Sequence, residues 1–278
     1  MNTRAAMLGG VALLLAATGA ATWGSLSHVR PPPAVPEIDA ARLPLPPLPP
    51  RISEGAEYDK CLALLSGDPG GARALAEAWQ ARGGGDGAAH CLGLSRIAGG
   101  KPEAGAAILD TLASASQSSA AVRATLYSQA AQAWMMAGQP RRAEQDLTQA
   151  LALAPGAPDL LVDRAAAAIA LKSYGEAVTD LSAALSDDPR RVDALVMRAT
   201  ALRQLGRLDA ARDDIGRALH EAPDSPEALL ERGILRQRAR DPAGARADWN
   251  RVLALAPDGA TADLAEQNLA LLDAGPPR

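Results

Sequence analysis

The sequence predicts an all-α protein, a solenoid in which pairs of helices stack on one another. Small apolar residues dominate the chain of 278 residues, which is 48% hydrophobic, contains 3% aromatic residues and has no Phe. Apolar residues recur at helical spacing, and no stretch alternates as a half-buried strand would. A proline also returns at equal intervals of about 34 residues, which is typical of a repeat architecture. These prolines are Pro155, Pro189, Pro223 and Pro257.

The first element, residues 1–27, is predicted to be a targeting segment. Arg4 gives it a positive start, and residues 5–27 carry no charge. Small residues follow the apolar run, as a signal peptidase prefers. The uncharged stretch is also long enough to span a bilayer, so a cleaved signal peptide and a retained signal anchor both remain open. In either case we expect the rest of the chain in the periplasm, or on the outer face of the inner membrane, of a bacterium.

The second element, residues 28–52, is predicted to be a Pro-rich linker. Nine of the twenty residues from Pro31 to Pro50 are proline. Such a segment favours an extended polyproline-like spacer over a helix or a strand. The alternative is that it serves as a ligand for a Pro-binding domain.

The third element is the repeat array itself. Each interval between these prolines contains two amphipathic stretches of about a dozen residues separated by a turn, which predicts a helix hairpin. A single hairpin cannot bury both of its apolar faces, so the hairpins must stack. Counted back from each proline, four further columns recur. They are Ala143, Ala177, Ala211 and Ala245; Asp146, Asp180, Asp214 and Asp248; Leu147, Leu181, Ile215 and Trp249; and Ala150, Ala184, Ala218 and Val252.

These columns resemble the tetratricopeptide repeat. The fourth repeat positions are Tyr127, Leu161, Leu195 and Leu229, and the eighth are Ala131, Ala165, Ala199 and Gly233. The resemblance implies four repeats over residues 124–259, stacked into a right-handed solenoid. Two degenerate repeats over residues 53–123 precede them, and a capping helix with a tail follows at residues 260–278. It also implies a concave groove that binds a protein or peptide partner.

Helical geometry selects the residues that face this groove, on the side of each first helix that points away from the core. Asp159, Asp193 and Glu227 would make the groove neutral to acidic, although acids that begin helices also stabilise the helix dipole. The groove lacks the Lys and Asn residues with which some relatives hold a carboxylate, so a basic or amphipathic segment fits better. The candidates are Gln129, Gln132, Met136, Asp163, Met197, Thr200, Gln204, Ile234 and Arg238.

Cys61 and Cys91 are the two cysteines of the chain. Both fall on the first helices of the degenerate repeats, and such helices lie side by side in this type of fold. Because an exported protein meets an oxidising compartment, we predict a Cys61–Cys91 disulfide. The alternative is two buried thiols that act as small hydrophobic residues.

An arginine column accompanies the aspartate column, and we predict structural ion pairs between them. Each arginine lies nearly midway in sequence between an earlier aspartate of the column and a later one. The spacing leaves both pairings open, and we favour the earlier aspartate, which would clamp one repeat to the next. We expect a structural role in preference to ligand binding. The residues are Asp146, Arg164, Asp180, Arg198, Asp214 and Arg232.

The sequence predicts no catalytic residue, no cofactor and no metal site. The three histidines have no ligand partner at suitable spacing, and His90 beside Cys91 would point away from it on a helix. A net charge of −4 argues against nucleic acid as a partner. We therefore expect a non-enzymatic scaffold for protein–protein interactions. The alternative is an assembly factor or a non-catalytic subunit of an envelope or secretion enzyme complex.

Overall fold

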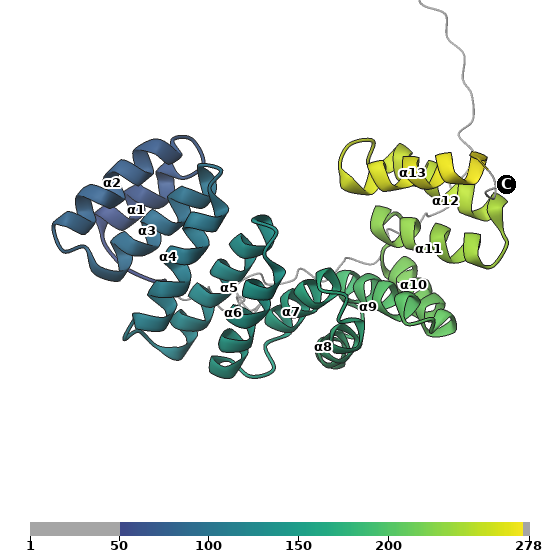
Figure 1. Cartoon of the computed structure of the whole chain (residues 1–278), viewed down its shortest axis with the longest axis horizontal. Coiled ribbons are helices and arrows are strands. Elements are labelled where there is room, and N and C mark those ends of the chain that lie inside the picture. Colours follow the sequence, from purple (N-terminus) through teal and green to yellow (C-terminus); the bar gives the residue numbers. More distant parts are fainter. Residues whose placement is uncertain (1–50, 275–278) are drawn as a thin grey trace, which may run out of the picture. The chain divides into compact units, whose positions relative to one another are not determined.

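The structure, a computed structural model, describes residues 51–274, all of which belong to one compact unit. The predicted targeting segment and nearly all of the Pro-rich linker lie outside these residues. Within them the chain forms thirteen helices and no strand (Figure 1). The helices are α1 (Ala56–Leu64), α2 (Pro69–Ala81), α3 (Gly85–Ala98), α4 (Pro102–Ala115), α5 (Ala120–Met136), α6 (Pro140–Leu153), α7 (Pro158–Ala170), α8 (Tyr174–Asp187), α9 (Val192–Gln204), α10 (Leu208–Glu221), α11 (Pro226–Arg238), α12 (Pro242–Leu255) and α13 (Ala260–Ala274).

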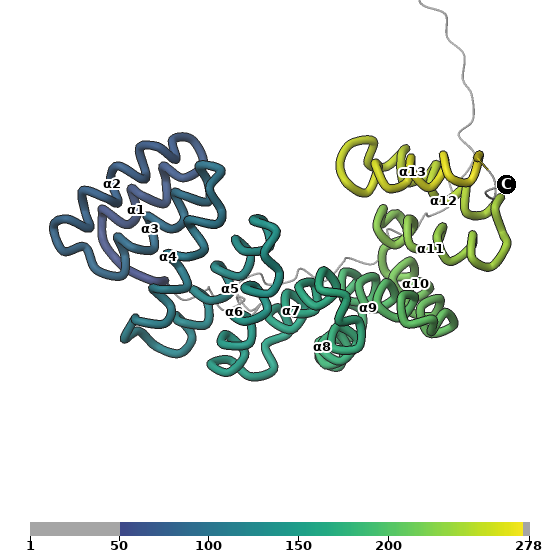
Figure 2. The backbone as a smooth tube through the Cα atoms, viewed as in Figure 1, coloured from purple at the N-terminus to yellow at the C-terminus, as the bar shows by residue number. Residues whose placement is uncertain are grey.

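Each helix packs mainly against the helix before it and the helix after it, so the hairpins are stacked in chain order (Figure 2). The odd-numbered helices from α5 to α13 also touch one another across the intervening even-numbered helix. This arrangement confirms the predicted all-α solenoid. None of the described helices is both long enough and apolar enough to cross a membrane.

The small-residue columns form the contact within each hairpin. Ala165 and Ala199 at the eighth repeat position, and Ala177 and Ala211 at the twentieth, are completely buried. Their methyl groups let the two backbones approach closely, which fills the core without aromatic residues. In the last repeat Gly233 replaces alanine, because a Cβ there would lie 2.2 Å from Trp249 Nε1.

The turn inside each repeat places one residue in the left-handed region of backbone conformation. Glycine occupies this position in two repeats, as Gly138 and Gly206. Lys172 and Arg240 occupy it in the other two, with φ angles of 63° and 62°. A side chain in this region costs roughly 1 kcal/mol relative to glycine, so these two turns are strained.

The boundaries of two helices differ from the sequence prediction. Helix α3 begins at Gly85, inside the stretch from Gly83 to Gly87, where so many glycines would indicate a turn. Helix α5 begins at Ala120, four residues before the predicted repeat, because the Ser119 hydroxyl accepts a hydrogen bond from Val122 N and caps it. The final helix α13 covers the end of the array, as a capping helix should.

Candidate partner-binding face

The nine candidate groove residues lie on the first helices of the four regular repeats. Helix α5 carries Gln129, Gln132 and Met136, α7 carries Asp163, α9 carries Met197, Thr200 and Gln204, and α11 carries Ile234 and Arg238. We call this set the groove face. The side chains that these helices direct into the core include Leu195, Ala199 and Leu202, so the groove face is the opposite side of the same helices.

The groove face is exposed at its edges and partly buried along its middle. Met136 is 65% exposed, which is unusual for a large apolar side chain. Gln132, Gln204 and Arg238 are also exposed. Each of the four helices contributes at least one side chain of intermediate burial, namely Gln129, Asp163, Met197, Thr200 and Ile234.

Two polar contacts cross this face between successive first helices. Gln132 Nε2 donates to Asp163 Oδ2 over 3.4 Å, which joins α5 to α7. Burial raises the pKa of the Asp163 carboxyl above its usual value. Arg191 donates to Asp159 at 2.6 Å and to Asp193 at 2.9 Å. These two aspartates begin α7 and α9, so one guanidinium offsets one of their two negative charges.

A buried ion pair joins α9 to α11 beside the groove face. Arg203 Nε lies 2.5 Å from Glu231 Oε1, and the two side chains are only 10% and 6% exposed. This pair belongs to none of the repeating columns of the sequence. The sequence does contain a signal for it. One repeat earlier the equivalent positions hold the apolar residues Ile169 and Met197, so two opposite charges appear here in place of two apolar side chains.

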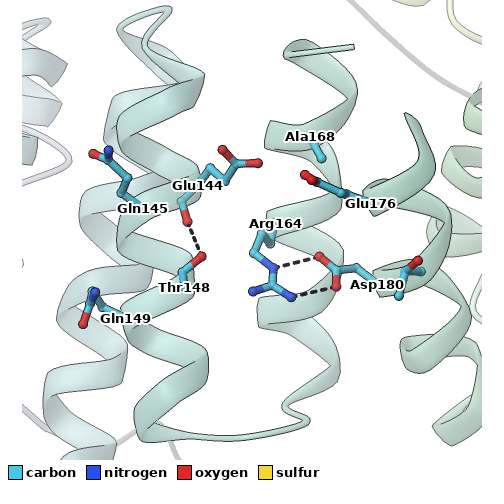
Figure 3. Close-up of a pocket in the computed structure, with 9 residues that line it drawn as sticks. Glu144, Gln145, Thr148, Gln149, Arg164, Ala168, Glu176 and Asp180 are labelled. Atoms are coloured by element: carbon cyan, nitrogen blue, oxygen red, sulfur yellow. Dashed lines mark hydrogen bonds and ion pairs between the residues drawn. The ribbon is translucent and has the colours of Figure 1, made fainter. Parts of the chain in front are cut away.

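The arginine column pairs differently from our prediction. We expected each arginine to clamp two repeats together by binding the earlier aspartate, which is Asp146, Asp180 or Asp214. Instead the partner lies 16 residues later, inside the same hairpin, and each arginine binds it through two nitrogens at 2.7–3.0 Å. Figure 3 shows the first of these pairs between α7 and α8. The pairs are Arg164–Asp180, Arg198–Asp214 and Arg232–Asp248.

The geometry of an antiparallel hairpin explains the correction. Each arginine lies as far before the left-handed turn residue as its aspartate lies after it, so the two are level with each other. Arg198 and Asp214, for example, are equidistant from Gly206. The predicted ion pairs also missed Asp248 and wrongly included Asp146. The residue opposite Asp146 in its hairpin, equally far from Gly138, is Ala130, which cannot form an ion pair.

Asp146 is therefore a buried carboxyl without its arginine. The side chain is nearly inaccessible, and its Oδ2 has no hydrogen-bond partner among the described residues. Burial, reinforced by the nearby Asp110 carboxylate, raises the pKa of Asp146 to about 7. The Arg142 guanidinium, which stacks 4.4 Å from the Trp134 ring centroid, opposes this rise only weakly.

Comparison with known proteins agrees with this geometry. The tetratricopeptide repeat family model matches residues 128–190 and 173–226. Among solved structures, MamA from Desulfovibrio magneticus RS-1 has a TM-score of 0.53 at 18% identity, over 68% of this chain and 96% of that one. A protein from Thermus thermophilus has a TM-score of 0.53 at 19% identity, over 67% and 100% of the two chains. No curated protein matches the chain in sequence.

Residues 128–226 are tetratricopeptide repeats. A third similar structure, YrrB, is described as a tetratricopeptide repeat protein with an unusual peptide-binding site. It has a TM-score of 0.51 at 16% identity and covers 70% of this chain and 97% of its own. At these identities the structures establish the fold of the tetratricopeptide repeats, while the family model identifies residues 128–226 as such repeats.

The two hairpins that precede the matched tetratricopeptide repeats are fastened by a disulfide. Cys61 on α1 and Cys91 on α3 are bridged, with their Cα atoms 6.1 Å apart, and this is the pair predicted from the sequence. Helix α1 has only nine residues and buries only Tyr58 and Cys61. The covalent bond therefore holds an element that contributes little apolar surface to the core.

His90 connects these degenerate repeats to the first regular tetratricopeptide repeat. Its Nε2 lies 2.7 Å from Gln129 Oε1, and its Nδ1 lies 2.9 Å from the Tyr58 hydroxyl. Because an amide oxygen only accepts, Nε2 must carry the proton, and Nδ1 accepts from Tyr58. Burial lowers the pKa of His90, so the neutral ring is favoured. Gln129 is thus engaged with α3 instead of being free for a partner.

The remaining chemistry of the described region is sparse. No group of three or more His, Cys, Asp or Glu residues in the described region has the proximity to hold a metal ion. His90 and Cys91 are adjacent in sequence, but the first is hydrogen-bonded to Gln129 and the second is in the disulfide.

Proposed function

We propose that this chain is an exported or membrane-anchored scaffold, without catalytic activity of its own, that binds a protein partner through the groove face. Tetratricopeptide repeats form scaffolds for protein–protein interactions, and four of them are stacked here. The observation that carries the proposal is the row of exposed and half-buried side chains on α5, α7, α9 and α11. Met136 at 65% exposure supplies an apolar contact that a partner would cover.

The charges of the groove face favour an amphipathic partner segment. Arg191 offsets one of the two negative charges of Asp159 and Asp193, which remain exposed, whereas Glu231 is buried in its pair with Arg203. Asp163 keeps a weak contact to Gln132. A basic side chain opposite Asp163, flanked by apolar groups against Met136 and Met197, would fit this pattern.

Two observations support export. Residues 5–27 form an uncharged stretch that starts after Arg4, as in signal peptides and signal anchors. The Cys61–Cys91 bridge is of the kind that persists in oxidising compartments outside the cytoplasm. A scaffold held at the outer face of the inner membrane, or released into the periplasm, would have both features.

Site-specific crosslinking tests the binding face. A photoreactive amino acid at Gln132, Thr200 or Arg238 should capture the same partner in the native envelope. The same amino acid at Ala183 or Asn250, which are exposed on the second helices α8 and α12, is the matched control. Capture from the control positions alone would contradict the proposal, because the partner would then bind the opposite side of the repeats.

A fusion experiment tests export separately. A phosphatase that is active only in the periplasm, fused after Arg278, should be active when the chain carries residues 1–27 and inactive when they are deleted. The same two fusions with a reporter that is active only in the cytoplasm should give the reverse pattern. Equal cytoplasmic activity with and without residues 1–27 would refute export while leaving the binding proposal intact.

A further inference from the structure

A second surface suited to binding lies between α10 and α11. Ile215, Leu219 and Leu235 form its apolar floor, and Arg212, Arg232 and Arg236 stand at its rim. We call this set of six residues the basic notch, which encloses a cavity of about 510 Å³. Two residues along a helix are about 200° apart, so Arg232 and Arg236 point away from Ile234 and the groove face.

The residues that line the basic notch include three arginines and no acidic residue. Arg232 and Arg236 both bind the single carboxylate of Asp248, at 2.7 and 2.8 Å. Arg212 contacts only Asp209, whose side chain is 97% exposed and lies one turn away on the same helix. Arg236 also lies 4.0 Å from Asp241, so each guanidinium has an acidic partner, but those acids are outside the residues that line the cavity. A guanidinium has five N–H donors, more than one carboxylate accepts.

The equivalent cavity two repeats earlier provides an internal comparison. Figure 3 shows this acidic notch, in which Glu144 and Glu176 flank the Arg164–Asp180 pair. Residues separated by two whole repeats occupy the same place in the two notches. Glu144 corresponds to Arg212, and Ala168 corresponds to Arg236. The repeat framework thus produces the cavity, while these exchanges reverse its charge.

Gly216 opens the floor of the basic notch. It corresponds to Thr148 of the acidic notch, and a Cβ added to Gly216 would meet no atom within 4 Å. Glycine in the middle of a helix costs roughly 1 kcal/mol relative to alanine, so packing within the hairpin does not explain it. The missing side chain leaves open space on this side of α10, next to Ile215 and Leu219, which are themselves only 1% and 9% exposed.

We propose that the basic notch binds a partner protein segment in which a carboxylate side chain neighbours a leucine-like side chain. The carboxylate would accept hydrogen bonds from Arg212 and Arg236, because a guanidinium fork matches a carboxylate in two parallel bonds. The apolar neighbour would cover the floor above Gly216. This surface is separate from the groove face, so the scaffold carries two binding surfaces of different chemistry.

Fluorescence anisotropy with the full chain and labelled synthetic peptides tests this proposal. The probe is an octapeptide with alternating leucine and glutamate, and its two controls replace every leucine with serine or every glutamate with lysine. We expect saturable binding of the probe alone. Gly216→Leu, which plugs the cavity, and Arg212→Glu, which reverses the rim, should each weaken binding by about tenfold or more. Thr148→Leu, at the same repeat position of the acidic notch, should change it less than about twofold.

Circular dichroism and thermal unfolding establish that each variant is folded, and Gly216→Ala, which should bind as the wild type does, adds a second check. Binding unchanged by Gly216→Leu would overturn the proposal, and so would equal binding of the serine peptide or equal weakening by Thr148→Leu. Displacement of the probe by millimolar inorganic phosphate would also overturn it, because the arginines would then form a general anion site. The proposal would also be overturned if the probe did not bind to the wild-type protein.

Discussion

Replacing Asp146 with Asn should make the protein more stable at pH 8 while leaving its stability at pH 4 nearly unchanged. The Asp146 carboxyl is buried, lacks the arginine found in the next three repeats, and lies near Asp110. Its pKa is raised from 3.8 to about 7. Below pH 4 the carboxyl is protonated in the folded and unfolded states alike, so Asn at this position is a close substitute for it.

The magnitude follows from linkage. Between pH 4 and pH 7 the folded state holds a proton that the unfolded state has lost, so the free energy of unfolding falls as the pH rises. A rise in pKa from 3.8 to about 7, at about 1.36 kcal/mol for each pH unit, amounts to at most about 4 kcal/mol. The Asn variant should therefore gain up to about 4 kcal/mol over the wild type by pH 8.

Urea unfolding of both proteins between pH 4 and pH 8 measures this difference directly. Taking the difference between wild type and variant removes the contributions of all other titrating groups, including His90. Asp180→Asn is the matched control, because it leaves Arg164 without its partner and should lower stability at pH 8 by about 3 kcal/mol. If the Asp146→Asn variant were less stable than the wild type at pH 8, the reasoning about the missing arginine would be refuted.

Three further predictions concern the other contacts. Arg198→Ala should lower the free energy of unfolding by about 3 kcal/mol. Adding Asp214→Ala should restore part of this loss in a double-mutant cycle. If the losses of the two single variants were strictly additive, a direct pair would be excluded. Cys61→Ser should cost about 3 kcal/mol by opening a loop with a sequence separation of 30, so a reductant that leaves wild-type thermal unfolding unchanged would contradict a stabilising bridge. His90 should contribute stability above about pH 6.5 that is lost as the pH falls through its lowered pKa. His90→Gln should abolish this dependence in urea unfolding at pH 5 and pH 7, and an unaltered profile would exclude it.

The periodicity of the sequence was sufficient to predict the helix hairpins and their stacking. A proline, an alanine and an aspartate that return at the same place in every repeat define where helices pack and end, and those features are local. The cysteine pair was predictable for a related reason, since Cys61 and Cys91 fall on first helices of adjacent hairpins. The boundaries were harder, because α3 begins at Gly85 within a run of glycines, and glycine disfavours a helix.

The partners of charged residues were less predictable than the helices. Spacing alone leaves two partners for Arg198, and only the level of each residue relative to Gly206 selects Asp214. The Arg203–Glu231 pair depends on how deeply α9 and α11 approach each other, which periodicity does not reveal. Gln129 was expected on the groove face, yet its hydrogen bond to His90 turns it toward α3. Such contacts depend on distances in the folded structure, which the spacing of residues in the sequence does not give.

Because each arginine clamp closes within its own hairpin, every hairpin from α7 to α12 keeps its Arg–Asp pair when it is copied or removed as a unit. A gene segment encoding α7 and α8 could be duplicated or deleted without separating a buried ion pair, whereas deleting either of the next two hairpins alone would strand one member of the Arg203–Glu231 pair. A clamp that crossed between hairpins would have made every change in repeat number costly. Arrays built in this way can lengthen or shorten during evolution in whole modules, and the hairpin of α5 and α6, with its solitary Asp146, marks where that modular set begins.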